Sequence, residues 1–174
     1  TAAANARCSH AVWVTGEGFQ RVANDTQPPS TWGEIPLGDA RSFEESHGLL
    51  PPRLRRQGIR IVISDLFWPG DPLPTLRKLT EGAAAVTLVQ LLAPADLEPP
   101  KPGNVQLEDS ETGETLSLYI DTTIQEQYRK TLQRLQQSWD HAAQQTGAEL
   151  VTLIADNLQG SLRSLEECRT LEPA

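Results

Sequence analysis

Four short runs of apolar and β-branched residues divide the chain, and each run is continuous rather than alternating. They are Ala11 to Thr15, Ile59 to Ser64, Ala85 to Leu92 and Leu150 to Ile154. Strands covered on both faces of a sheet have this pattern, because neither set of side chains meets water. The runs therefore predict four buried strands.

A helix is predicted between the second run and the third. Leu73, Leu76 and Leu79 recur at helical spacing within Pro72 to Thr80, and Gly82 closes the segment. A strand, a helix and a second strand in this order form a βαβ unit, in which the two strands run parallel. The middle of the chain therefore predicts an α/β fold.

Two more helices are predicted nearer the C-terminus. The first runs from Thr122 to about Thr146, with a capping box at Thr122 to Gln125 and a glycine cap at Gly147. Its apolar stripe consists of Ile124, Tyr128, Leu132, Leu135, Trp139 and Ala142. The second runs from about Leu158 to Leu171 and places Leu158, Leu162, Leu165 and Cys168 on its inner side.

Smaller elements complete the expected fold. Asp39 to Leu50 has room for a short helix, and Val105 to Leu107 with Thr115 to Ile120 predict a small hairpin. We expect one domain over residues 1–174, with a mainly parallel open sheet, helices on both faces and the hairpin as an excursion. This is a Rossmann-like α/β architecture with right-handed crossovers.

Composition excludes some classes of function. The 174 residues carry 23 acidic and 15 basic side chains, a formal net charge of −8, so binding to nucleic acid or to anionic lipid is not expected. Two cysteines without metal or disulfide spacing indicate a reducing compartment. With no bilayer-spanning run and no secretion signal, the sequence predicts a cytoplasmic protein, or one at the cytoplasmic face of a membrane if the chain belongs to a longer anchored protein.

One acidic residue stands where open α/β sheets bind ligands. Asp65 follows Ile61-Val62-Ile63-Ser64 at the carboxyl end of a predicted central strand, and Trp68 and Asp71 follow it. The alternative for Asp65 is an ordinary role in ordering the loop, since Asp often accepts backbone amides after a strand. Trp68 either offers an exposed anchor to a protein partner or folds over its own loop.

Three segments around this aspartate resemble a bacterial family. Ile61-Val62-Ile63-Ser64-Asp65-Leu66-Phe67 resembles the central strand of von Willebrand factor type A-like proteins associated with MoxR-type AAA ATPases. Val89 to Glu98 and the acidic hairpin Leu107 to Glu114 resemble the next parts of that family in order. The resemblance extends from about Ile59 to Leu171.

The resemblance implies a metal-ion-dependent adhesion site at the top of the sheet. Such a site gathers an Asp-x-Ser-x-Ser motif, a threonine and an aspartate around Mg²⁺, which prefers oxygen ligands. Asp65 matches the last of these ligands, but no Asp-x-Ser-x-Ser occurs in this sequence. Two explanations stay open: the chain keeps the scaffold without the metal, or a first strand precedes Thr1, which the absence of methionine favours.

Other reactive groups give no second site. His10 is close to Cys8 in sequence, but neighbours on an extended chain point to opposite faces and no acid stands nearby to orient the imidazole. Gly16-Glu17-Gly18 lacks the third glycine of a phosphate cradle and reads as a hairpin turn before a strand at Phe19 to Val22.

Three functions remain. The one we expect is a non-catalytic protein-binding or adaptor domain that presents Ser64, Asp65, Trp68 and Asp71 to a partner, with or without Mg²⁺. The resemblance implies a MoxR-type AAA ATPase as that partner, in assembly or a chaperone-like process. The second is a Mg²⁺-dependent phosphoryl-transfer enzyme that uses the strand-end carboxylate, with Asp71 and Lys78 as the nearest charges in sequence. The third is a purely structural domain of a larger protein.

Overall fold

The computed structural model of the chain describes residues 8–35, 41–108 and 113–156. These residues fall into two compact units. The smaller unit contains residues 8–35, 41–54 and 113–114, and the larger unit contains 55–108 and 115–156. The helix predicted from about Leu158 to Leu171 lies outside the described residues.

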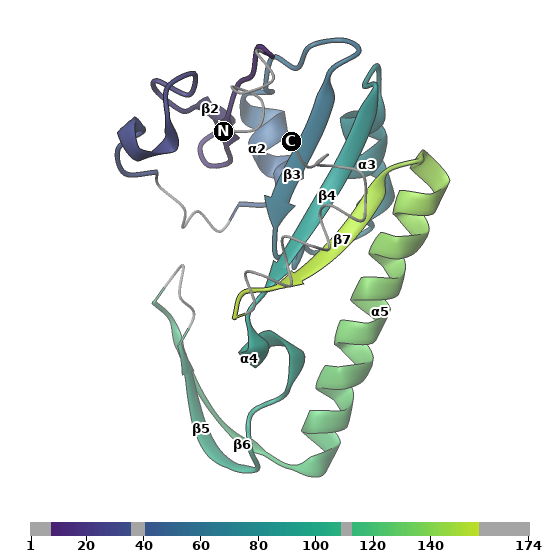
Figure 1. Ribbon diagram of the computed structural model, residues 1–174. Helices are drawn as coiled ribbons and strands as arrows, with labels where there is room; N and C mark the ends of the chain where they lie inside the picture. The colour runs from purple at the N-terminus through teal and green to yellow at the C-terminus, as the bar shows by residue number, and fades with distance from the viewer. Residues whose placement is uncertain (1–7, 36–40, 109–112, 157–174) are drawn as a thin grey trace. The chain divides into compact units, whose positions relative to one another are not determined.

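The larger unit is built on a three-stranded parallel sheet with the strand order β3-β4-β7 (Figure 1). β3 (Ile59–Ser64) and β4 (Ala85–Leu92) pair in parallel and are connected through α3 (Pro72–Thr80), which confirms the predicted βαβ unit. β7 (Glu149–Ile154) pairs in parallel with the other side of β4. The described residues therefore have the expected α/β fold with a parallel sheet.

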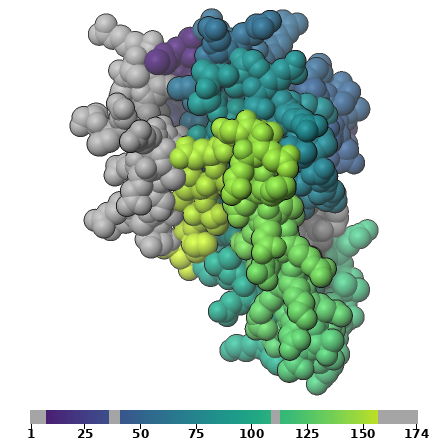
Figure 2. Space-filling view, turned by 90° about the vertical axis from the view of Figure 1, so that its right-hand side faces the viewer, coloured from purple at the N-terminus to yellow at the C-terminus, as the bar shows by residue number. Residues whose placement is uncertain are grey.

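One face of this sheet is covered by α3 and by α5 (Thr122–Thr146), which pack against each other (Figure 1). Figure 2 looks onto α5, drawn in green beside β7 in yellow. The predicted apolar stripe of α5 is buried or half-buried along its whole length. The core contains Leu76, Leu79, Val86, Leu88, Leu92, Trp139, Ala142 and Ala143, each at most 4% exposed.

Burial on both faces is confirmed for β4 and is wrong for β3. Every residue of β4 from Val86 to Gln90 is buried. In β3, Ile59, Ile61 and Ile63 expose 73%, 51% and 68% of their surface. The physical reason is position, because among the described strands β3 lies at one end of the sheet and β4 lies in the middle. A continuous apolar run does not distinguish the two.

The chain between β4 and β7 makes the predicted excursion. It forms α4 (Pro94–Leu97), then an antiparallel hairpin of β5 (Gly103–Glu108) and β6 (Thr115–Ile120), and then α5. The capping box predicted at Thr122 is wrong, because the N-cap is Asp121, whose carboxylate accepts the Ile124 N–H at 2.8 Å. The glycine cap is confirmed, since Gly147 has a φ of +71°.

The smaller unit contains a short antiparallel pair, β1 (Trp13–Val14) with β2 (Gln20–Arg21), followed by η1 (Pro29–Thr31) and α2 (Phe43–Leu49). The buried strand predicted at Ala11 to Thr15 is therefore wrong, because only two half-buried residues pair, and they pair with β2. The turn at Gly16-Glu17-Gly18 folds the chain back and makes a local hairpin instead.

None of the described helices combines the length and the apolar character needed to span a membrane.

Candidate functional site

The loop that follows β3 carries the predicted site. The strands are parallel, so their carboxyl ends lie at the same end of the sheet. Asp65 follows β3 at that end, and its side chain is exposed. Asp65 Oδ1 accepts the Phe67 N–H at 3.1 Å and the Ser64 hydroxyl at 3.4 Å. Ser64 Oγ accepts the Leu66 N–H at 3.1 Å. Both side chains therefore order the loop, which is the ordinary role considered for Asp65.

A buried glutamine holds the same loop from the neighbouring strand. Gln90 of β4 is 1% exposed, and its Nε2 donates to the Asp65 carbonyl at 3.0 Å. Its Oε1 accepts the Thr152 hydroxyl of β7 at 3.0 Å. Both polar atoms of this buried amide therefore have partners, and leaving them without partners would cost about 1–3 kcal/mol. Through these two hydrogen bonds the glutamine links the ends of the three parallel strands. Sequence reasoning missed it, although a single amide inside an apolar strand was the available signal.

Leu66 takes the loop through a left-handed turn. Its φ is +60° and its side chain is 0% exposed. For a residue with a Cβ, this conformation is about 1–2 kcal/mol less stable than the right-handed one. Trp139 of α5 opposes that cost, because its indole N–H donates to the Leu66 carbonyl at 2.9 Å inside the core. The turn is thus held by the buried leucine side chain and by this hydrogen bond.

The tryptophan of the loop folds inward and a phenylalanine faces solvent. The Trp68 ring lies 5.4 Å from the Trp139 ring at 70°, an edge-to-face contact, and Trp68 is half-buried. Phe67 is 39% exposed. Asp71 is the N-cap of α3, and its Oδ1 accepts the Leu73 N–H at 2.9 Å. The first turn of the loop therefore presents the Asp65 carboxylate and the Phe67 ring.

The described residues do not by themselves make a Mg²⁺ site. Asp65 and Ser64 supply oxygen atoms, but both already accept backbone amides of the loop. In the part of the chain that the structure describes, no three His, Cys, Asp or Glu side chains gather closely enough to hold a metal ion. Mg²⁺ gives up its water reluctantly and needs several oxygen ligands, so one carboxylate is too few.

The structure separates Lys78 from Asp65. Lys78 lies in the last turn of α3, and its carbonyl accepts from Arg60 Nη1 at 3.4 Å. Arg60 is near the start of β3, whereas Asp65 follows its end. At about 3.3 Å per residue, the five steps of strand between them span about 16 Å. The lysine named in the phosphoryl-transfer hypothesis therefore lies at the opposite end of the sheet.

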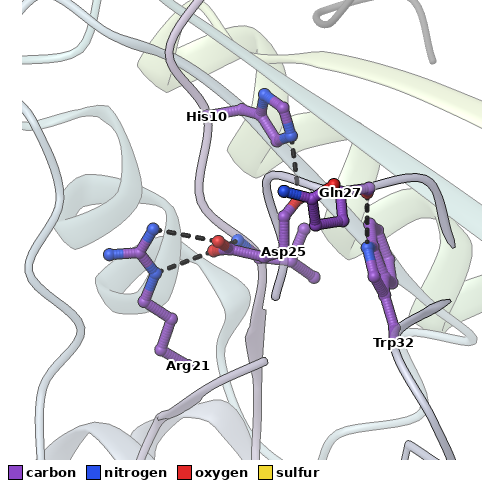
Figure 3. A network of polar contacts seen from close by, with 6 residues as sticks. His10, Arg21, Asp25, Gln27 and Trp32 are labelled. Carbon is purple, nitrogen blue, oxygen red and sulfur yellow. Dashed lines mark hydrogen bonds and ion pairs between the residues drawn. The ribbon is translucent and has the colours of Figure 1, made fainter. Parts of the chain in front are cut away.

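A second polar cluster lies in the smaller unit (Figure 3). The Asp25 carboxylate is buried and accepts from Arg21 Nε at 2.8 Å, from Arg21 Nη2 at 2.9 Å and from the Val12 N–H at 2.9 Å. Its hydrogen bonds with the Arg21 guanidinium lower the pKa of Asp25, against burial, which raises it. The same pairing raises the pKa of Arg21. The Asp25 carboxylate thus links the turn after β2 to β2 through Arg21, and to the segment that enters β1 through the Val12 N–H.

His10 belongs to this cluster and faces backbone oxygens. Its Nε2 lies 2.8 Å from the Asp25 carbonyl, and its Nδ1 lies 3.3 Å from the Cys8 carbonyl. Nearby, the Trp32 indole N–H donates to the Gln27 carbonyl at 2.9 Å (Figure 3). Both ring nitrogens of His10 therefore face backbone carbonyls within the smaller unit.

Comparison with known proteins adds the family. Residues 21–138 match the family described as protein of unknown function DUF58, and this match covers more than half of the chain. The chain belongs to the DUF58 family. The matched part of this DUF58 chain includes the loop after β3 and Gln90, and it ends one residue before Trp139.

Relatives of this DUF58 chain occur in mycobacteria. An uncharacterized protein of Mycobacterium avium is 30% identical over 105 residues, which is 59% of this chain and 60% of that protein. Uncharacterized proteins of Mycobacterium bovis and Mycobacterium tuberculosis are 28% identical over 102 residues, 59% of this chain and 32% of each protein. The matched region thus spans less than two thirds of these relatives. No solved structure matches the chain.

Proposed function

We propose that this DUF58 chain is a protein-binding domain that presents the loop Asp65 to Trp68 to a partner protein and catalyses no reaction. The observation that carries the proposal is the anchoring of this loop. Gln90 and Trp139 hold two consecutive carbonyls of the loop from the core, while the Asp65 carboxylate and the Phe67 ring stay exposed. A loop already fixed in shape loses little conformational freedom on binding, which favours affinity.

The exposed pair suits recognition of a protein. An aromatic ring supplies apolar contact area, and a carboxylate beside it selects a basic group or shares a cation with the partner. Asp71 supports the loop indirectly. Its carboxylate caps α3 by accepting the Leu73 N–H and so fixes the far end of the loop. Ser64 fixes the near end through the Leu66 N–H.

The finer form of the proposal rests on the resemblance of Ile61 to Phe67 and of Leu107 to Glu114 to von Willebrand factor A-like proteins. By that resemblance the partner is a MoxR-type AAA ATPase of the cytoplasm, and the process is assembly or chaperone-like. Mg²⁺ takes part only if the partner or another segment adds oxygen ligands, since the described residues supply one carboxylate.

Binding to the purified MoxR-type ATPase of the same organism tests the proposal, measured by titration calorimetry in Mg²⁺ and in EDTA. Asp65→Ala removes the carboxylate, whereas Asp65→Asn keeps an oxygen for the Phe67 N–H and removes only the charge. Asp140→Ala, an exposed aspartate on α5, is the matched control. If the carboxylate contacts the partner, both Asp65 variants weaken binding by about tenfold or more, equivalent to about 1.4 kcal/mol.

The variants separate the possible roles. Loss of binding in Asp65→Ala alone, with Asp65→Asn like the wild type, would reduce Asp65 to ordering its own loop. Equal binding of wild type and both variants, in Mg²⁺ and in EDTA, would reject the loop as the contact. A loss that appears only in Mg²⁺ would assign a shared cation to the complex.

A further inference from the structure

Three polar side chains cross the parallel sheet in one row, close to its carboxyl end. Ser64 of β3 lies opposite Gln90 of β4, and Gln90 lies opposite Thr152 of β7. Residues that are opposite each other on paired strands project from the same face of a sheet. The three side chains therefore lie side by side on one face, at the level where the loop after β3 begins.

Two members of this row bond directly to the loop. Ser64 Oγ accepts the Leu66 N–H at 3.1 Å, and Gln90 Nε2 donates to the Asp65 carbonyl at 3.0 Å. Thr152 is linked to the loop through Gln90, whose Oε1 accepts the Thr152 hydroxyl at 3.0 Å. Thr152 and the Asp65 carbonyl are thus joined by two hydrogen bonds that share one amide group.

The two ends of the Gln90 amide are not interchangeable. A backbone carbonyl only accepts hydrogen bonds, so the NH₂ end of the amide must face the Asp65 carbonyl. The Oε1 end then faces β7, where it needs a donor, because Gln90 is 1% exposed and a buried acceptor without a partner is unfavourable. A threonine hydroxyl supplies this donor. The Thr152 hydroxyl therefore stabilises the amide in the orientation that holds the loop.

We propose that Thr152 is a positioning residue for the Asp65 loop and acts through Gln90. The peptide unit that Gln90 holds joins Asp65 to Leu66, and Leu66 has the left-handed φ of +60°. Rotation of this peptide unit would displace both the Asp65 side chain and the Phe67 ring that follows. The proposal concerns the shape of the loop, and its consequence for partner binding rests on the proposed function.

Amide hydrogen exchange of the whole chain, measured residue by residue by NMR, tests the proposal without a partner. Thr152→Val removes the hydroxyl and keeps the shape of the side chain. Exchange at Leu66 and Phe67 should become about fivefold faster or more, because the loop opens more easily without this hydrogen bond. Thr152→Ser keeps the hydroxyl and should retain the wild-type rates. Thr115→Val is the matched control, since it makes the same change at an exposed threonine of β6 in the larger unit.

A second background shows whether Thr152 acts through Gln90. Gln90→Met replaces the amide by an apolar side chain of similar length and should by itself speed exchange at Leu66 and Phe67. Adding Thr152→Val should then change nothing further, because the hydroxyl has no amide left to hold. Equal effects of Thr152→Val in both backgrounds overturn the proposal. Circular dichroism verifies that each variant is folded, and if Gln90→Met is not, the contrast between Thr152→Val and Thr152→Ser decides alone.

Two further exchange results overturn the proposal. One is a Thr152→Val chain with wild-type rates at Leu66 and Phe67. The other is a chain in which the amides of β4 accelerate by the same factor as those of the loop, which would show a general loss of stability.

Binding to the MoxR-type ATPase is a separate measurement. Thr152→Val should bind more weakly than the wild type, whereas Thr152→Ser and Thr115→Val should bind equally well. Unchanged binding by Thr152→Val, with faster exchange in the loop, overturns its role in recognition. If the wild type itself does not bind, the proposed function fails, and the exchange rates still decide whether Thr152 positions the loop.

Discussion

Replacing Trp139 with phenylalanine removes a single hydrogen-bond donor from beneath the Asp65 loop. The indole N–H donates to the Leu66 carbonyl at 2.9 Å, and the two residues are 2% and 0% exposed. Phenylalanine keeps an aromatic ring in the core but offers no donor. The carbonyl then has no partner in a place closed to water, and the left-handed turn at Leu66 loses a restraint.

Three contributions set the expected cost. A buried carbonyl without a partner costs about 1–3 kcal/mol. The smaller ring leaves space and loses apolar contact, which costs about 1 kcal/mol. Part of the edge-to-face contact with Trp68 is lost as well, at about 0.5 kcal/mol. We expect the free energy of unfolding of the larger unit to fall by about 2.5–4.5 kcal/mol.

Urea unfolding followed by circular dichroism at 222 nm measures this change, because α5, with 25 residues the longest of the described helices, belongs to the larger unit. Tyr128→Phe is the matched comparison. It lies on the same helix and removes a hydroxyl that donates to the Asp96 carbonyl at 2.8 Å, with almost no change in volume. Its expected cost is about 1 kcal/mol, with the same urea dependence as the wild type.

A free energy of unfolding for Trp139→Phe within about 0.5 kcal/mol of the wild-type value would refute the reasoning, since neutral surface substitutions fall in that range. A cost equal to that of Tyr128→Phe would show that packing at Trp139 contributes little. The variant should also bind the partner more weakly than Asp140→Ala does, because its loop is less fixed.

Three further substitutions have predicted effects, two in the smaller unit and one at the C-terminal cap of α5 in the larger unit. Because pairing with Arg21 lowers the pKa of Asp25, its stabilising contribution is complete above the unfolded pKa of about 3.9 and is lost as the pH falls through the lower folded pKa. Asp25→Asn should lower the stability of the smaller unit at neutral pH and flatten its acid dependence, measured by acid titration of its amide resonances; an unchanged acid profile would contradict this. Gly18→Ala should destabilise the smaller unit by about 2 kcal/mol or more, because its φ is +92° and the new Cβ would lie 2.4 Å from Leu50 Cβ. Gly147→Ala, at a φ of +71° with open space around it, should cost the larger unit only about 1 kcal/mol in thermal unfolding, and equal costs at both glycines would rule out the contact with Leu50.

Local pattern was enough to predict most elements of the larger unit. The apolar run at Ile59, the leucine spacing within Pro72–Thr80 and the stripe on Thr122–Thr146 each occur within a few turns of chain, and each element is found with the predicted bounds. The turn at Gly16-Glu17-Gly18 was also readable, because the chain folds back there and β2 pairs with β1. Elements that depend on neighbours in sequence are therefore predictable here.

Contacts between distant segments were not predictable from the same patterns. Gln90 meets Thr152 across 62 residues, and Trp139 meets the Leu66 carbonyl across 73 residues. Neither the spacing nor the type of these residues names its partner. The exposed isoleucines of β3 were missed for a related reason, since edge and central strands differ in their neighbours and not in their own composition.

The order of strands in the sheet has a consequence for how the chain acquires its fold. β3, α3 and β4 are contiguous, so they can assemble soon after they leave the ribosome, whereas β7 is made only after α4, the hairpin and α5. Joining β7 to β4 closes a long loop, and such closures slow folding. The nascent chain therefore passes through a stage in which β4 has only β3 beside it and its other side is bare. Misassembly during synthesis would begin at that bare side, before α5 and β7 arrive to cover it.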